Sequence, residues 1–249
     1  GFDPVRVSDG YSNTVNEAIF ERLLGYDFLA RPAKLVPEVA ESMPEVTDNG
    51  RTYTFRIRKG VHFTPDPAFG GKPRELTADD FVYTFKRFVD PKNRSPWAFM
   101  LEGRIEGLDE LIEAAKRHGR FDYDARVSGL QALDRQTIRF RLKQPNHVFL
   151  YTLAHSPFGA MAREVVEKYG DDLHAHPVGT GPYALKEWKR ASRIVLEANP
   201  GYRGFTWDFA PSDSEKDAAI VAVMRGKTMP QIGRVEISII EEEQSRWLA

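Results

Sequence analysis

Apolar residues recur at helical spacing most clearly in the stretch that follows Leu76. They lie three or four positions apart and so gather on one side of a helix: Ala78, Phe81, Val82, Phe85 and Phe88. Thr77 stands where an N-cap residue is favoured, and two aspartates follow in the first turn, where negative charge suits the helix dipole. Lys86 and Arg87 lie near the opposite pole. The pattern predicts an amphipathic helix whose apolar side faces a core.

Alternation of apolar and polar residues predicts strands elsewhere in the chain. After a turn signal at 48–50, the segment 51–58 places Tyr53, Phe55 and Ile57 on one face and polar residues on the other. This favours one strand of an antiparallel pair with a solvated face. Four further segments show strand patterns: 138–142, 184–189, 194–198 and 235–240.

Shorter stretches also show helical periodicity. Residues 15–24 predict a helix that begins after a turn-like segment at 8–13 and ends at Gly25, with a brief strand at 26–29. Because Pro and Gly crowd the segment 62–75, we expect a surface loop there. Further helices are expected at 108–115, 148–153, 163–169 and 217–225.

The two ends of the chain lack the sequence signals expected at the start and the end of a complete protein. The start lacks the charged and apolar regions of a signal peptide. Acidic residues at 241–243 precede Trp247 and Leu248, and no stop signal follows, which predicts a helix that continues past Ala249. We therefore expect the chain to be a fragment of a longer protein.

Composition limits the function classes without selecting one. Of the 249 residues, 41% are hydrophobic and 29% are charged, as in folded globular domains. The 35 basic and 36 acidic residues nearly cancel, so nothing favours nucleic acid or an anionic membrane surface. The absence of cysteine excludes disulfides, thiolate metal sites and a cysteine nucleophile. No apolar run reaches the roughly 20 residues of a membrane-spanning helix.

Few residues form clusters that could carry chemistry. His174 and His176 lie beside two aspartates and could be offered as the metal ligands of a hydrolase, but alternate residues of one loop rarely converge on an ion. The segment 178–182 lacks the lysine of a phosphate-binding loop, and its proline removes a backbone donor. Asp79 and Asp80 point to different sides of a helix and are better explained by capping. We therefore expect no enzyme, no metal site and no cofactor.

Several stretches resemble one protein family, in that family's chain order. Leu-Thr-Ala-Asp-Asp-Phe-Val-Tyr at 76–83, followed by Lys-Arg, closely resembles the signature of extracellular solute-binding proteins that serve oligopeptide and dipeptide ABC importers. Gly-Thr-Gly-Pro-Tyr at 179–183 and Asn-Pro-Gly-Tyr at 199–202 are similarly distinctive. The chain departs from many relatives at 62–75 and 205–233, where it is longer. Further similar stretches are 19–27, 35–42, 49–61 and 129–138.

The resemblance implies an α/β fold with α+β character, the first lobe of a periplasmic-binding-protein-like fold. Its main part would combine residues 1–43 with 164–249. Residues 44–163 would form an inserted subdomain of antiparallel sheet and helices. In the family a second lobe follows and the ligand lies between the lobes, so we expect this chain to end before the second lobe begins.

The same resemblance implies binding without chemistry. The solute-binding component of an ABC importer would capture oligopeptides or dipeptides outside the cytoplasmic membrane and deliver them to the permease subunits. The expected state is a monomer without nucleic acid, in the periplasm, or anchored outside the cell if a lipid-attachment motif precedes residue 1. Nickel chelates, haem, opines and oligosaccharides stay open as other solutes of the same fold. The metal-dependent hydrolase and a chaperone-like module are the alternatives from other classes.

Candidate ligand contacts lie in two separate stretches. Tyr11, Ser12 and Asn13 belong to the turn-like opening segment, and Trp97 and Met100 follow Pro96. The large apolar side chains at 97–100 can be read as core or as pocket wall. The resemblance also implies an acidic residue in the other lobe that holds the peptide amine.

Overall fold

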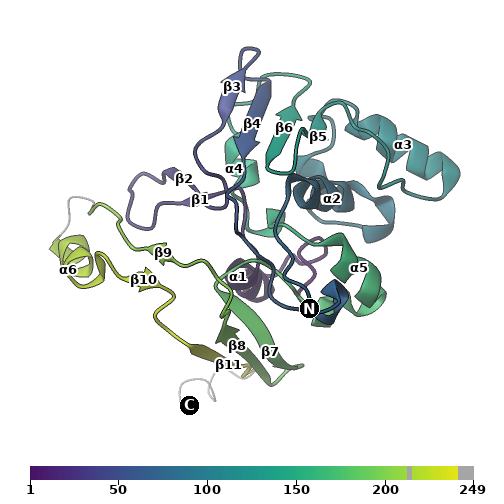
Figure 1. The fold of residues 1–249 in the computed structure, drawn as a ribbon. Helices are drawn as coiled ribbons and strands as arrows, with labels where there is room; N and C mark the ends of the chain where they lie inside the picture. The colour runs from purple at the N-terminus through teal and green to yellow at the C-terminus, as the bar shows by residue number, and fades with distance from the viewer. Residues whose placement is uncertain (212–214, 241–249) are drawn as a thin grey trace.

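The computed structural model describes residues 1–211 and 215–240 of this chain (Figure 1). A four-stranded sheet lies at one end and a three-stranded sheet at the other, with helix α1 (Gly10–Ile19) between them. Helices α2 (Ala78–Val89) and α3 (Leu108–His118) lie beside the four-stranded sheet. One hydrophobic cluster contains residues of both sheets and of these helices. The two sheets therefore share a continuous core.

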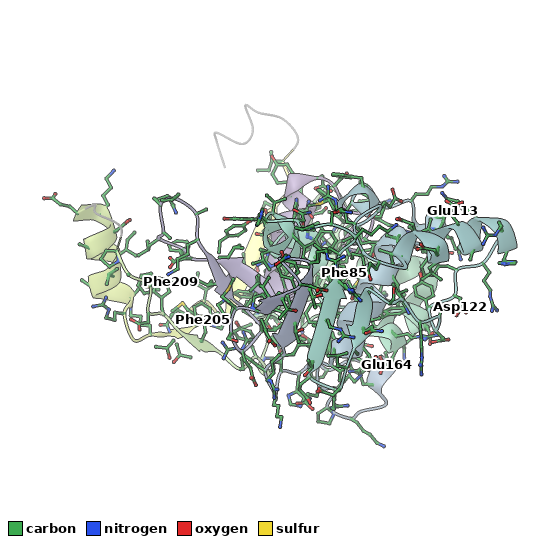
Figure 2. The ribbon with its side chains drawn as sticks, turned by 90° about the horizontal axis from the view of Figure 1, so that it is seen from above. Phe85, Glu113, Asp122, Glu164, Phe205 and Phe209 are labelled. Atoms are coloured by element: carbon green, nitrogen blue, oxygen red, sulfur yellow. The ribbon has the colours of Figure 1, made fainter. Side chains whose placement is uncertain are left out.

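The four-stranded sheet is antiparallel throughout. Its order is β3 (Glu45–Thr47), β4 (Thr52–Arg56), β6 (Thr137–Arg141) and β5 (Leu130–Ala132). The alternation predicted for residues 51–58 is confirmed, since Tyr53 and Phe55 are buried whereas Arg56 is exposed. Phe85 of α2 packs on this sheet through Phe140, with ring centroids 5.1 Å apart, and lies near the middle of the body in Figure 2.

Helix α2 begins where predicted, with Thr77 as its N-cap residue. The Asp80 carboxylate accepts hydrogen bonds from the backbone N–H and the hydroxyl of Thr77, at 2.8 and 3.0 Å. Asp80 also pairs with Arg74 at 2.7 Å. Arg87, predicted only to complement the helix dipole, is buried and pairs with the buried Asp3 at 3.0 Å. The helix is therefore held by ion pairs as well as by its apolar stripe.

The boundaries predicted for the opening segment are wrong. Helix α1 starts at Gly10, so most of the supposed turn is its first turn, and Asp9 caps it by accepting a hydrogen bond from Ser12 N at 2.8 Å. The helix ends at Ile19 because Phe20 is extended. Leu24 instead starts β1 (Leu24–Tyr26), which pairs with β2 (Leu35–Pro37). Leu23 and Leu24 fit the helical spacing, although Leu23 lies in a bend and Leu24 in β1.

The turn that precedes the first strand of the three-stranded sheet packs against the end of α1. Its antiparallel order is β11 (Arg234–Ser238), β8 (Arg193–Ala198) and β7 (Tyr183–Lys189), which confirms the three predicted strands. Gly181 N donates to Ile19 O at 2.8 Å, and a Cβ atom on Gly179 would lie 2.0 Å from the same oxygen. This close approach of two backbones requires glycine. Helices α4 (Phe149–Leu153) and α5 (Arg163–Tyr169) also form as predicted.

Residues 205–211 and 215–229 form an arm that projects from the body (Figure 1). Its strands β9 (Phe205–Thr206) and β10 (Thr228–Met229) pair antiparallel, and helix α6 (Glu215–Met224) lies between them, near the predicted 217–225. A small buried cluster joins Leu29, from the turn between β1 and β2, to Trp207 and Val221 of the arm.

The helix predicted at 241–249 lies outside the described residues. In the rest of the chain, residues 1–211 and 215–240, no helix is long and apolar enough to cross a membrane.

Candidate functional site

One hydrogen bond joins Trp97 to the segment just before α1, the helix that carries three of the predicted ligand contacts. Trp97 Nε1 donates to the carbonyl oxygen of Val7 at 2.6 Å, across 90 positions of sequence. Val7 lies just before α1, and Trp97 just before the short 3-10 helix Ala98–Met100. The bond therefore holds the start of α1 beside residues 97–100.

The three predicted contacts on α1 differ in their exposure. Tyr11 is 78% exposed, whereas Ser12 and Asn13 are half-buried. The backbone N–H of Ser12 is used by the Asp9 cap. Asn13 Oδ1 is buried and has no hydrogen-bond partner among residues 1–211 and 215–240. Buried polar groups are nearly always paired, so water or a ligand is expected to donate to this oxygen.

Residues 97–100 contribute both to the core and to the surface. Trp97 and Met100 are partly buried against the main hydrophobic cluster. Phe99, between them, is 62% exposed. The segment thus exposes one aromatic ring, that of Phe99, two positions after Trp97.

His155 adds a polar group to this junction that sequence reasoning missed. Its ring lies 4.8 Å from that of Trp97, centroid to centroid. Burial lowers the pKa of His155, and the nearby Arg22 lowers it further, so the imidazole is neutral near pH 7. A neutral imidazole can donate from one nitrogen and accept at the other. Its local sequence carries no signal, because its partner Trp97 lies in a distant stretch.

A buried ion pair fixes the segment that follows α1. Arg203 donates from Nη1 to Glu21 Oε1 and from Nη2 to the carbonyl oxygen of Glu38, the latter at 3.2 Å. The Glu21 side chain is 2% exposed, and its Oε2 has no partner in the described part of the chain. Burial raises the pKa of Glu21 to about 7 although Arg203 opposes it, and Glu38 adds to the rise. Arg203, at the end of the motif at 199–203, therefore holds Glu21 and Glu38 of the N-terminal segment in place.

The two histidines that were weighed as metal ligands pack on different aromatic rings. His174 meets Trp188 edge-on at 5.9 Å, and His176 stacks on Tyr169 at 4.1 Å. Within residues 1–211 and 215–240, no group of three or more His, Cys, Asp or Glu side chains could hold a metal ion. That part of the chain therefore gives no support to the alternative of a metal-dependent hydrolase.

Known proteins match most of the chain. The family model described as bacterial extracellular solute-binding proteins, family 5 Middle, matches residues 34–249. Peptide transport periplasmic protein SapA of Salmonella typhimurium is 34% identical over 207 residues, which are 81% of this chain and 35% of SapA. This chain spans about a third of the length of the curated relatives that it matches.

Solved structures agree with the family match. The crystal structure of Haemophilus influenzae OppA in complex with RPPGFSPFR gives a TM-score of 0.67 at 29% identity, over 82% of this chain and 37% of that one. The substrate-binding domain of an oligopeptide ABC transporter from Bacillus anthracis gives 0.73 at 22% identity, over 98% and 40%, which is a likeness of fold alone. The predicted fold class is confirmed. The chain belongs to the bacterial extracellular solute-binding proteins of family 5.

Proposed function

We propose that this chain is part of the solute-binding component of an ABC importer, which captures peptides outside the cytoplasmic membrane and delivers them to a permease. The family consists of solute-binding proteins rather than enzymes, which supports binding without chemistry. The name of SapA and the bound peptide in the Haemophilus influenzae OppA structure support a peptide as the solute. Nickel chelates, haem, opines and oligosaccharides gain no such support.

The observation that carries this proposal is the Trp97–Val7 junction. It holds Trp97 against the segment just before α1, the helix that carries the exposed Tyr11 and the unpartnered Asn13 Oδ1. An extended peptide offers what such a surface can use, because its backbone N–H groups can donate to a free acceptor while its side chains pack on aromatic rings. Tyr11, Ser12, Asn13, Trp97 and Met100 are the proposed peptide contacts of this chain.

Location, partners and domain organisation form part of the same proposal. The relatives are named as periplasmic proteins, so we place this one in the periplasm, as a monomer that meets the permease subunits. Residues 1–43 with 164–249 would form the main part, and 44–163 an inserted subdomain. The position of the four-stranded sheet, between Glu45 and Arg141, supports that division.

The indole N–H signal of Trp97 in NMR spectra offers a direct test. Adding a mixture of short peptides is expected to shift this signal, because the indole lies at the proposed contact. The Trp188 indole, which packs between Phe2 and His174, is the internal control and should stay in place. NMR detects binding even at millimolar dissociation constants, so a weak complex still registers.

Trp97→Phe assigns the signal and tests the hydrogen bond to Val7. It keeps an aromatic ring but removes the donor, so it should lower the free energy of unfolding by about 1 kcal/mol, the usual contribution of one hydrogen bond. It should also weaken peptide binding, because the junction is no longer held together. If peptides leave the Trp97 signal unmoved while a metal chelate or a sugar shifts it, the peptide proposal is wrong.

A further inference from the structure

Glu17 is an exposed carboxylate on α1, one helical turn after Asn13. Its side chain is 50% exposed. Side chains four positions apart lie on the same side of a helix, with their Cβ atoms about 5–6 Å apart. Asn13 Oδ1, which is buried and has no hydrogen-bond partner in the described part of the chain, is therefore a neighbour of this carboxylate. Helix α1 thus carries two acceptors close together, one charged and one neutral.

Arg22 is shared unequally between two carboxylates. Glu38 accepts hydrogen bonds from Arg22 Nε at 2.9 Å, from Nη2 at 3.3 Å and from the backbone N–H of Arg22 at 3.0 Å. Glu17 Oε1 lies 3.5 Å from Nη1 of the same guanidinium, which is longer than a good hydrogen bond. One positive charge therefore meets two negative charges, and Glu38 holds it more closely. Glu17 keeps negative charge that a ligand can balance.

Glu17 belongs to the same neighbourhood as the Trp97 indole. The short 3-10 helix Ser156–Phe158 packs against α1, and His155 is its N-cap residue. The ring of His155 lies 4.8 Å from that of Trp97, centroid to centroid. Burial lowers the pKa of His155, Arg22 lowers it further and Glu17 raises it, so both charges act on this ring. The segment that begins at His155 therefore connects the indole with the side of α1 that carries Glu17.

An ammonium group matches this pair of acceptors. It carries one positive charge and three N–H donors, and it accepts no hydrogen bond. One N–H can donate to Asn13 Oδ1 while the positive charge lies beside the Glu17 carboxylate. A carboxylate of the ligand would be repelled at the same place, and a neutral group would leave the charge of Glu17 unbalanced. Peptides supply ammonium groups from two sources, the amino terminus and the lysine side chain.

We propose that Glu17 is a specificity-determining residue, which selects solute peptides that place an ammonium group beside Asn13 on α1. The inference rests on the proposed function and concerns which peptides are preferred, not whether peptides bind. The ion pair is open to solvent, and such pairs change an affinity only modestly. We therefore expect a preference of about twofold to fivefold over a matched neutral peptide.

Two matched pairs of peptides test this selection and separate the two sources of the ammonium group. The first pair is an alanine tripeptide with a free amino terminus and the same peptide N-acetylated. The second pair is an N-acetylated tripeptide with a central lysine and the same peptide with norleucine, which lacks the charge. In NMR titrations of the full chain, the charged member of at least one pair should bind about twofold to fivefold tighter. Added salt should reduce this preference.

Variants separate Glu17 from the other exposed carboxylates. Glu17→Gln should remove the preference for the charged peptide, and Glu17→Lys should turn it into a preference for the neutral one. Glu113→Gln is the matched control, because Glu113 of α3 is 56% exposed and also pairs with a cation, Lys116, at 2.8 Å. This control should keep the preference. Circular dichroism verifies that each variant is folded.

The outcomes distinguish this inference from the proposed function. Equal affinities within both peptide pairs, or a preference that is unchanged in both Glu17 variants, overturn the inference, while a peptide-dependent shift of the Trp97 signal still supports peptide binding. If no peptide binds and the Trp97 signal does not move, both the inference and the proposed function are wrong.

Discussion

Glu21→Gln is expected to change how the stability of the chain depends on pH. Glu21 is buried beside Arg203, and burial outweighs the arginine, so the pKa of Glu21 rises from 4.5 to about 7. An acid with a higher pKa in the folded state binds more protons folded than unfolded. Its contribution to stability is complete below pH 4.5 and is lost as the pH rises through 7.

The magnitude follows from the size of the pKa change. A shift from 4.5 to about 7 corresponds to about 3 kcal/mol, at roughly 1.4 kcal/mol per pKa unit. Most of this, about 2.5 kcal/mol, falls between pH 5 and 8. Glu164 and Asp109 have lowered pKa values and change stability in the opposite direction. The informative quantity is therefore the difference between wild type and variant at each pH.

Urea denaturation between pH 5 and 8 measures that difference. Glutamine fills the same space without ionising, so wild type should lose about 2.5 kcal/mol relative to Glu21→Gln over this range. Glu17→Gln, at a side chain that is 50% exposed, is the matched control and should follow wild type. A difference that stays constant or grows in favour of wild type would mean that Arg203 keeps Glu21 ionised, and that burial does not set its charge.

Two further substitutions test contacts on which the fold depends. Arg87→Met should lower the free energy of unfolding by about 3–5 kcal/mol, because it leaves the buried Asp3 carboxylate without its partner. In urea denaturation, the double variant that also carries Asp3→Asn should recover part of this loss. If it recovers none, the two residues do not act as a pair. Gly179→Ala should lower the free energy of unfolding by more than about 2 kcal/mol, because the new Cβ atom meets Ile19 O. Gly233→Ala is the control, because a Cβ atom there has open space, and it should change the free energy of unfolding by no more than about 0.5 kcal/mol. Equal effects of the two substitutions would refute the close approach of the backbones at Gly179.

Periodicity predicted most of the regular elements because each satisfies its pattern locally. Helices α2 and α5 and strands β4, β7 and β8 lie where their apolar spacing indicated. The opening segment is the exception. Leu23 and Leu24 fit a helical stripe, but they are buried because of the ribbon that begins at Leu24, which depends on pairing with β2. A periodic pattern records which residues are buried and not which element buries them.

The candidate site was harder to predict than the fold, because its contacts join distant stretches. The resemblance pointed to Tyr11 and Trp97 separately, and their roles in binding stay a prediction. Nothing near Trp97 in sequence indicates that its indole reaches Val7 or that His155 lies against its ring.

Helix α2 supports the candidate site without belonging to it. Its polar side chains each reach a different segment: Asp80 pairs with Arg74, Lys86 Nζ donates to the carbonyl oxygens of Tyr123 and Ala125, and Arg87 pairs with Asp3. A helix that only covered a sheet would not need a buried cation, which is costly to desolvate.

Asp3, which pairs with Arg87, lies four residues before Val7, and the carbonyl oxygen of Val7 accepts the hydrogen bond from the Trp97 indole. Fixing Asp3 therefore restricts the segment that carries one half of the junction. It follows that Arg87→Met should broaden or shift the Trp97 indole signal even without peptide, whereas a purely local effect on stability would leave that signal in place while the chain stays folded. The signature helix thus acts on the site through the N-terminal segment that it anchors.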